Sequence, residues 1–342
     1  MTVWLISYTA RGRALAARAA DIWKKEGHGC RTFALPKFAQ EGDEPMTLSA
    51  SDWAGQGFEQ ADALVFCCAS GIAVRAVAPH VRDKRRDPAV LVLDEGGTFV
   101  IPLLSGHLGG ANALAEELAA KLPATPVLTT ATDVNGLFAV DVFAKNNDLF
   151  IEDMALAKAV SAALLAGETV GFRSDLPMEG LLPKGLTAGE ADLGILVSSS
   201  NEKPFPRTLR LTPRSYAVGL GCRRGKDEAA LEAFLRENLD RCGVGLHQVM
   251  ALASIDIKRD EPGLMALADE LGLPFVTYSA EELKRAPGEF TPSAFVQGVT
   301  GVDSVCERAA VLASGGTLAV RKVAENGMTF ALAKKEEGIR FE

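Results

Sequence analysis

Apolar runs of strand length alternate with segments of helical periodicity in the first part of the chain, and this alternation constrains the fold more than any other feature. The runs that predict buried strands are "TVWLISYT" (2–9), "ALVFCCA" (63–69), "AVLVLDEGG" (89–97) and "TPVLTT" (125–130). Helical apolar spacing occurs at residues 13–25, 71–81 and 109–122. This order predicts a mainly parallel sheet with helices on both faces, and such sheets bind ligands at the carboxyl ends of their strands.

The alternation changes near residue 138 and restarts near residue 216, which divides the 342-residue chain into three blocks. The third block closes with two strand-like runs around Asn326-Gly327, a strong hairpin signal. We therefore predict an α/β protein in which two α/β domains with mainly parallel sheets are joined by a smaller α+β middle domain. The predicted domains are residues 1–137, 138–214 and 215–342.

The composition argues against several classes of protein. The formal net charge of -8 argues against broad binding to nucleic acid or to anionic membranes. The first apolar run has no basic segment before it and is too short for a signal sequence or a membrane span, so we expect a cytoplasmic protein. The six cysteines include no CxxC pair and no histidine at metal-ligand spacing, which predicts neither a zinc site nor a disulfide framework.

Three loops of the first block are expected to face the same strand ends. They are residues 67–79, 93–112 and 129–136. Each places Gly, Ser, Thr or Asp directly after a buried strand, where an open α/β sheet builds its binding site. Turn and N-cap chemistry explains Ser70-Gly71 and Thr132-Asp133 equally well, so both interpretations stay open.

The stretch "PLLSGHLGGANALAEELA" (102–119) carries the strongest candidate, His107. Its surroundings do not mark it as a core histidine, and the unperturbed pKa of imidazole suits a general acid or base near neutrality. The flanking glycines let the backbone approach a ligand, and the first helical N–H groups offer donors to an anion or a carbonyl. The ligand-contacting positions predicted in this loop are Ser105, Gly106, Gly109, Gly110 and Asn112.

Charged residues beside the other strands of this block are further candidates. Asp94 and Glu95 end an apolar strand, so one carboxylate is expected to point into the strand-end crevice, although a surface turn explains them equally well. Arg75 stands one turn into the helix that Ser70 opens and is placed for direct contact with an anion. The basic run "HVRDKRRDP" (80–88) could steer a polyanion or form a solvated loop.

Strand-end loops of the third block supply a second set of cations. "GLGCRRG" (219–225) precedes a helix as a phosphate loop would, but it lacks the Lys-Ser/Thr of a P-loop and the third glycine of a dinucleotide fingerprint. A glycine turn with Gly221, Arg223 and Arg224 at a helix N-terminus suits carboxylates instead. The cations after the next strand are Lys258 and Arg259.

These loops resemble the cobalt-precorrin-5A hydrolases of anaerobic cobalamin biosynthesis, the CbiG family. In the first block the resemblance rests on "SGIAVRAVAP", "PLLSGHLGGANALAEELA" and "TTATDVNG". In the third block it rests on "VGLGCRRG", "LASIDIKRDEPGL", "FVQGVTGVDSVCERAA" and "GGTLAVRKV". The motifs cover both large blocks in the family's order, and the middle block stands where the family has its variable middle domain.

The resemblance implies a substrate and a reaction. Family members act on a cobalt-containing tetrapyrrole in which the ring A acetate is closed as a lactone onto C20. They open this lactone and release C20 as acetaldehyde, which gives cobalt-precorrin-5B. The resemblance implies no cofactor and no metal site of the protein's own, because the cobalt is carried by the substrate. The many acetate and propionate groups of such a substrate give the cationic loops a purpose.

On this basis we expect His107 to act as the general acid/base, and the N–H groups of residues 109–112 to hold the tetrahedral oxyanion. Asp94, Glu95 or Asp133 would orient the histidine or the attacking water. The cations that would bind peripheral carboxylates are Arg75, Arg223, Arg224, Lys258 and Arg259.

The sequence leaves partners and alternative functions to be distinguished. We expect a cobalt-containing tetrapyrrole polycarboxylate as ligand, and neither nucleic acid nor membrane; transient contact with neighbouring pathway enzymes and a homo-oligomer stay open. The main alternative is a non-catalytic tetrapyrrole carrier or scaffold of the same pathway, since no complete nucleophile–base–acid triad can be identified. A nucleotide- or sugar-phosphate-binding enzyme is a third hypothesis, and the missing P-loop residues count against it.

Overall fold

The computed structural model describes residues 1–83, 86–107 and 109–341, so Lys84 and Arg85 of the basic run lie outside the described residues. The chain divides into two compact units, Met1–Val142 and Phe143–Glu342. In the part of the chain that the structure describes, no helix combines the length and apolar character that crossing a membrane requires.

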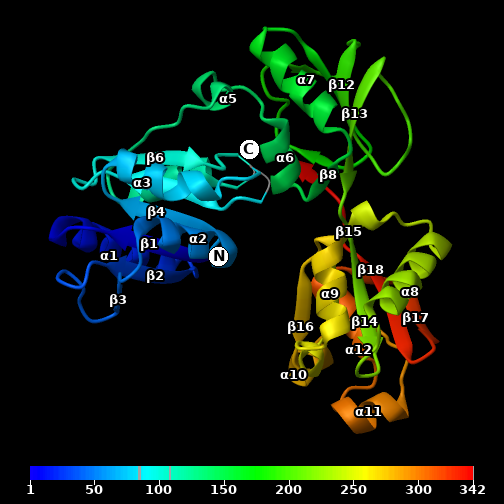
Figure 1. The fold of residues 1–342 in the computed structure, drawn as a ribbon. Coiled ribbons are helices and arrows are strands. Elements are labelled where there is room, and N and C mark those ends of the chain that lie inside the picture. The colour runs from blue at the N-terminus through cyan, green and yellow to red at the C-terminus, as the bar shows by residue number, and fades with distance from the viewer. Residues whose placement is uncertain (84–85, 108, 342) are drawn as a thin grey trace. The chain divides into compact units, whose positions relative to one another are not determined.

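The first unit is built on a seven-stranded sheet with the order β3-β2-β1-β4-β5-β6-β7 (Figure 1). Its strands are β1 (Thr2–Ser7), β2 (Gly29–Ala34), β3 (Asp43–Pro45), β4 (Ala63–Cys67), β5 (Ala89–Leu93), β6 (Phe99–Leu104) and β7 (Thr125–Pro126). Its helices are α1 (Ala10–Lys25), α2 (Ala50–Gln60), α3 (Ser70–Val77), η1 (Ala78–His80), α4 (Ala111–Lys121) and α5 (Ala131–Val134), and α6 (Val140–Asn146) spans the boundary to the second unit. Helices α1 and α4 bury Trp23 and Leu118 against one face of the sheet, and α2 and α3 cover the other face around Trp53.

The direction of β6 corrects the expectation for the candidate loops. Strands β1 to β5 run parallel, but β6 pairs antiparallel with β5, with Leu93 opposite Val100 and Val90 opposite Leu104. Residues 94–98 are therefore a hairpin turn, and the loop after β6 begins at the amino ends of the parallel strands. The prediction that all three candidate loops face the same strand ends is wrong. Because β7 runs parallel to β6, the loops that follow these two strands do share one end of the sheet.

The second unit begins with a five-stranded sheet of order β11-β9-β12-β13-β8. Its elements are β8 (Leu149–Ile151), α7 (Met154–Leu165), β9 (Val170–Ser174), β11 (Leu186–Thr187), β12 (Leu193–Val197) and β13 (Arg207–Pro213). Strands β9, β11, β12 and β13 are parallel and β8 is antiparallel to β13, so this domain is more parallel than the predicted α+β arrangement. The parallel order could not be recognised in the sequence, because the short loops that connect these strands carry none of the helical periodicity that marks a βαβ unit.

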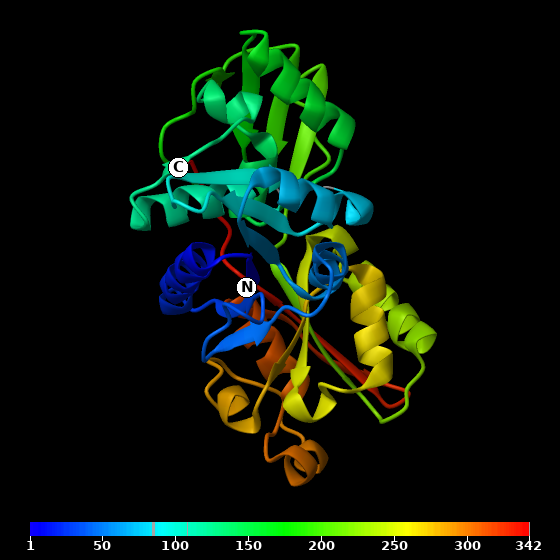
Figure 2. The ribbon, with the colours of Figure 1, turned by 60° about the vertical axis from the view of Figure 1, so that its left-hand side comes forward.

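A second five-stranded sheet, of order β16-β15-β14-β18-β17, forms the remainder of this unit. Its strands are β14 (Tyr216–Cys222), β15 (Val249–Ile255), β16 (Phe275–Tyr278), β17 (Thr317–Glu325) and β18 (Met328–Lys334). Its helices are α8 (Glu228–Arg241), η2 (Leu246–Gln248), η3 (Asp256–Lys258), α9 (Pro262–Leu271), α10 (Ala280–Lys284), α11 (Ala294–Thr300) and α12 (Val305–Ser314), and a short parallel pair is formed by β10 (Met178–Glu179) and β19 (Ile339–Arg340). Helices α8 and α9 lie side by side over β14 (Figures 1 and 2), and α12 packs on the opposite face.

Candidate functional site

The loop between β6 and α4 folds back on itself. Three successive backbone N–H groups, of Gly110, Ala111 and Asn112, donate to the carbonyls of His107, Ser105 and Gly106 over 3.0, 3.1 and 3.0 Å. These bonds satisfy donors that the first turn of a helix otherwise leaves unpaired. The proposed use of these three N–H groups as oxyanion donors is therefore wrong for this geometry, because loop carbonyls already occupy them.

Glycine is required where this loop is tightest. A Cβ on Gly109 would lie 2.2 Å from the Cβ of Ser105 and 2.7 Å from its carbonyl oxygen. A Cβ on Gly106 would lie 2.7 Å from the side-chain oxygen of Asn112, and Gly110 has a φ of 85°, in the left-handed region. The glycines thus allow the close turn that presents His107.

The His107 site consists of this histidine and the side chains of Asn112, Thr132, Asp133 and Asp141. The Nδ1 atom of His107 lies 3.3 Å from Oδ2 of Asp141, and Nε2 lies 3.2 Å from Oδ2 of Asp133. The hydroxyl of Thr132 is also 3.2 Å from Nε2. The imidazole is thus held at both nitrogens, with its side chain only 15% exposed.

Asn112 organises the Asp133 side of the His107 site. Its side-chain N–H group donates to Oδ2 of Asp133 over 2.6 Å and to the hydroxyl of Thr130 over 2.7 Å. Asn112 is buried in the first turn of α4, whereas Thr130 and Asp133 belong to the loop and short helix after β7. The two loops that share one end of the sheet therefore meet through Asn112 and His107.

Electrostatics favours the protonated histidine. The hydrogen bond to Asp141 is the main cause that raises the pKa of His107; burial opposes this shift, and Asp133 adds to it. Burial works against a charged Asp141, but the hydrogen bond and the charge of His107 prevail and lower the pKa of this carboxyl. An imidazolium carries a proton on each ring nitrogen, so the protonated form of His107 would donate to both neighbouring carboxylates.

Two predicted carboxylates lie outside the His107 site. Asp94 accepts from the N–H groups of Gly96, Thr98 and Phe99, and so closes the β5–β6 hairpin. The carboxylate of Glu95 accepts from the hydroxyl of Thr9. Both residues stand at the carboxyl ends of the parallel strands, opposite the His107 loop, so the idea that they orient His107 is wrong.

The α3 candidates are also separate from His107. Ser70, Gly71 and Arg75 are exposed at the carboxyl ends of the parallel strands. The guanidinium of Arg75 donates to the carbonyl of Gly71 over 2.9 Å, within its own helix. The structure therefore gives Arg75 a local partner and leaves contact with a ligand as a prediction.

The sequence analysis missed Asp141 as a partner of His107. This residue lies in the first turn of α6 and belongs to the first compact unit, which extends to Val142. The predicted boundary at residue 137 assigned it to the middle domain. An acidic residue at the start of a helical segment was the available signal, but nothing in the spacing connected it with a histidine 34 positions earlier.

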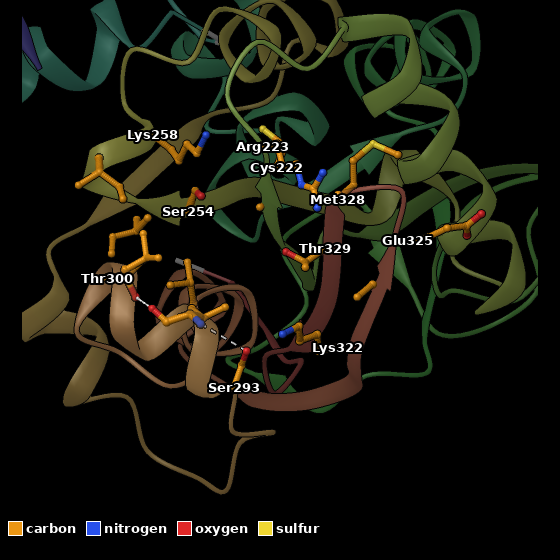
Figure 3. Close-up of a pocket in the computed structure, with 18 of the residues that line it drawn as sticks. Cys222, Arg223, Ser254, Lys258, Ser293, Thr300, Lys322, Glu325, Met328 and Thr329 are labelled. Atoms are coloured by element: carbon orange, nitrogen blue, oxygen red, sulfur yellow. Dashed lines mark hydrogen bonds between the residues drawn. The ribbon is translucent and has the colours of Figure 1, made fainter.

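The cationic loops of the last sheet surround a pocket of about 440 Å³ (Figure 3). We call this the β14–β18 pocket, because β14, η3, α11 and the β17–β18 hairpin supply its walls. The predicted residues Gly221, Arg223 and Lys258 line it, whereas Arg224 and Arg259 are exposed and do not. Its other principal lining residues are Cys222, Ser254, Ile257, Val296, Val299, Lys322, Glu325, Met328 and Thr329.

Hydrogen bonds fix Lys258 and its surroundings. The ammonium of Lys258 lies 2.7 Å from Oε2 of Glu261, and this carboxylate also accepts from the N–H group of Gly225 over 2.7 Å. The bond from Lys258 lowers the pKa of Glu261 despite its burial. Burial raises the pKa of the Cys222 thiol, which makes this cysteine a poor nucleophile.

The acidic and sulfur-containing side chains do not form an evident metal centre. Within the described ranges, no group of three or more His, Cys, Asp or Glu residues is arranged to hold a metal ion.

Three family models match successive parts of the chain. "Cobalamin synthesis G N-terminal" matches residues 52–133, "Cobalamin biosynthesis central region" matches residues 138–213, and "Cobalamin synthesis G C-terminus" matches residues 216–333. These matches give the three-domain organisation of the family.

Curated relatives extend the similarity over the whole chain. A cobalt-precorrin-5A hydrolase of Salmonella typhimurium is 37% identical, and the match covers 97% of each chain. A protein of the same name from Priestia megaterium is 35% identical over 81% of this chain and 79% of the relative. Protein CobE of a Sinorhizobium species is 31% identical over 34% of this chain and 77% of its own length. The chain therefore belongs to the CbiG family, the cobalt-precorrin-5A hydrolases of cobalamin biosynthesis.

Proposed function

We propose that this protein hydrolyses the ring A lactone of cobalt-precorrin-5A at the His107 site and releases C20 as acetaldehyde, giving cobalt-precorrin-5B. The observation that carries the proposal is the imidazole held between the carboxylates of Asp133 and Asp141, 3.2 and 3.3 Å away. An imidazolium so placed can give a proton to a leaving oxygen and take one back later. Two relatives named cobalt-precorrin-5A hydrolase support the choice of substrate.

Lactone opening is the first step that these residues would catalyse. Water attacks the lactone carbonyl, and a carboxylate such as Asp133 accepts a proton from it. The tetrahedral intermediate then collapses, the bond between the carbonyl carbon and the ring oxygen breaks, and His107 gives its proton to that oxygen. The products are a free acetate group on ring A and a hydroxyl group on C20, so the step consumes one water.

Carbon–carbon cleavage follows from the new hydroxyl group. The neutral imidazole left by the first step removes the hydroxyl proton, and a C20 carbonyl forms as the bond between C20 and the macrocycle breaks. The bonding electron pair passes to the macrocycle, which is protonated or keeps the pair in its conjugated system. The protein needs no cofactor of its own in this scheme, because the cobalt is part of the substrate.

The positioning of His107 would rest on Asp141, Asn112 and Thr132. Asp141 fixes Nδ1, so Nε2 is directed to the side where Thr132 and Asp133 lie. Asn112 in turn fixes Asp133 through a 2.6 Å hydrogen bond. A cytoplasmic location and a homo-oligomer stay predictions.

The test is incubation of the purified protein with enzymatically prepared cobalt-precorrin-5A, with acetaldehyde trapped and the pigment followed by mass spectrometry. We expect acetaldehyde and the matching mass change from the wild type and from His28→Asn, and their loss from His107→Asn. His28 is a suitable control because it lies in the turn before β2, outside the His107 site. Pigment binding without acetaldehyde from the wild type would support the carrier alternative instead.

A further inference from the structure

The β14–β18 pocket concentrates positive charge in an acidic protein. Arg223, Lys258 and Lys322 line it, against the single carboxylate of Glu325 among the lining residues that the structure describes. The chain as a whole has a formal net charge of -8. In Figure 3 the three cationic side chains stand around the same hollow, with the hydroxyl of Thr329 between Arg223 and Lys322. A local excess of cations of this kind attracts anions.

Two of these cations have no anionic partner among the residues that the structure describes. Lys258 is paired with Glu261 at 2.7 Å, and its side chain is 12% exposed. The guanidinium of Arg223 and the ammonium of Lys322 form neither a hydrogen bond nor an ion pair with any of the described residues. Lys322 is nevertheless half-buried. A partly desolvated cation is most stable beside an anion, so a bound carboxylate would supply the anionic partner that the described residues do not provide.

Aliphatic side chains form one part of the pocket wall beside the hydroxyl groups of Ser254, Ser293 and Thr300, and some of these aliphatic side chains are open to solvent. Ile257 and Val299 are 53% and 65% exposed at its edge, and Val296 and Met328 lie further along the lining. Exposed aliphatic side chains that border a pocket indicate a ligand with an apolar surface of its own. Small hydrophilic anions such as phosphate would leave this wall uncovered.

Taking the proposed function as its basis, we propose that the β14–β18 pocket is a second tetrapyrrole-binding site, which holds one edge of the macrocycle by its carboxylates and one of its faces by aliphatic contact. The acetate and propionate groups bind the unpaired cations, and Ile257, Val296 and Val299 cover the ring. A pocket of about 440 Å³ that opens to solvent takes an edge of a large ring rather than the whole of it. All the lining residues of this site belong to the last sheet and to the helices and loops that adjoin it.

The first experiment titrates the full-length protein with uroporphyrin III, an octacarboxylate tetrapyrrole whose absorbance reports binding. We expect Arg223→Gln and Lys322→Gln each to raise the Kd about tenfold, because each removes one charge-assisted hydrogen bond. Arg236→Gln is the matched control, because it removes a cation of α8 that pairs with Glu232 outside the pocket. Unchanged Kd and stoichiometry in the double variant Arg223→Gln/Lys322→Gln would overturn the proposal.

A second pair of variants tests the apolar wall. Ile257→Ser and Val299→Ser change exposed side chains, so they are expected to leave the fold intact. They should raise the Kd for uroporphyrin severalfold and leave its dependence on salt unchanged. If only the cation variants weaken binding, or if ATP binds more tightly than uroporphyrin, the pocket is a general anion or phosphate site and the proposal is wrong.

Acetaldehyde formation on the same proteins separates this inference from the proposed function. Binding of uroporphyrin through Arg223 and Lys322 without acetaldehyde formation by the wild type would contradict the proposed function alone. If the wild type forms acetaldehyde but the Kd for uroporphyrin is unchanged in the Arg223 and Lys322 variants, the result would contradict the second site alone.

Discussion

In the His107 site each imidazole nitrogen contacts a carboxylate, whereas in the β14–β18 pocket Arg223 and Lys322 have no anionic partner among the described residues. The first arrangement is complete without a ligand, and the second is not. A site that moves protons needs its groups oriented before the substrate arrives, because positioning lowers the barrier only if it is already established. A site that binds carboxylates gains affinity from cations that the protein itself does not neutralise.

The largest expected effect is the separation of turnover from binding. We expect His107→Asn to lower kcat by about 10²- to 10⁴-fold, the usual contribution of general acid–base catalysis, and to leave the Kd for uroporphyrin within twofold. We expect Arg223→Gln and Lys322→Gln to raise the Kd for uroporphyrin and to leave kcat, measured at saturating substrate, close to that of the wild type. Turnover assays and pigment titrations on the same preparations measure both quantities. Equal losses of turnover in both sets of variants would remove the functional distinction between the two regions.

Tight packing is the second respect in which the regions differ. Gly109→Ala would place a Cβ 2.2 Å from the Cβ of Ser105, so we expect a loss of about 1–3 kcal/mol in the free energy of unfolding, together with lower turnover. Gly298→Ala in α11 is the matched change beside the β14–β18 pocket, because its Cβ would meet no atom within 4 Å. That variant should be neutral or gain up to about 1 kcal/mol, as Ala replaces Gly in a helix. Urea denaturation measures both, and equal stabilities would contradict the tight turn at Gly109.

The protonation state of the His107 site predicts an effect of pH. The raised pKa of His107 means that its contribution to stability is complete below about 6.5, the unfolded value, and is lost as pH rises through the folded pKa. The lowered pKa of Asp141 means that its contribution is present above about 3.8 and is lost as pH falls through the folded pKa. The pair therefore stabilises the fold most between these two values.

Asp141→Asn tests this dependence. It should destabilise the protein at pH 5–6, and its difference from the wild type should shrink at alkaline pH, where His107 loses its charge. It should also move the alkaline limb of the turnover profile to lower pH, because the pKa of His107 falls when its first partner is neutral. Thermal unfolding at several pH values and a pH–rate profile are the measurements. A merely structural role for Asp141 would lower stability equally at all pH values and leave the limb in place.

The contrast between two hairpins shows what the sequence could and could not predict. The turn at Asn326-Gly327 was predicted, and both residues have positive φ values, 48° and 77°, as the two-residue turn of this hairpin requires. The turn at residues 94–98 was interpreted as part of one loop over residues 93–112, and the apolar run that follows the turn, which contains Pro102, was not predicted as a strand. Proline is tolerated there because β7 pairs only with Phe99 and Val100, so β6 is an edge strand at that point.

Because β6 was not predicted as a strand, part of the predicted site was assigned to the wrong end of the sheet. With β6 assigned to a loop, His107, Asp94 and Ser70 appeared to share one end of the sheet. The antiparallel return of β6 sends His107 to the other end, where Asp133 was correctly expected nearby and Asp141 was not. Residue types at strand ends are visible in a sequence, but strand direction depends on a pairing between distant segments. That pairing is a tertiary interaction, which local periodicity does not contain.

The smallest expected effect concerns the carboxyl ends of the parallel strands, where Glu95 lies and where the sequence predicted residues that orient His107. Glu95 is exposed and accepts a hydrogen bond from Thr9, so Glu95→Gln keeps an acceptor and removes only the charge. We expect kcat within about twofold of the wild type and an unchanged alkaline limb, because an exposed charge beyond the reach of His107 is screened by solvent. Asp133→Asn is the comparison, since it removes a charge 3.2 Å from Nε2 and should lower turnover strongly. If Glu95→Gln instead moves the pH–rate profile as Asp141→Asn does, the carboxyl ends of the parallel strands take part in the chemistry and the assignment of catalysis to the opposite end is wrong.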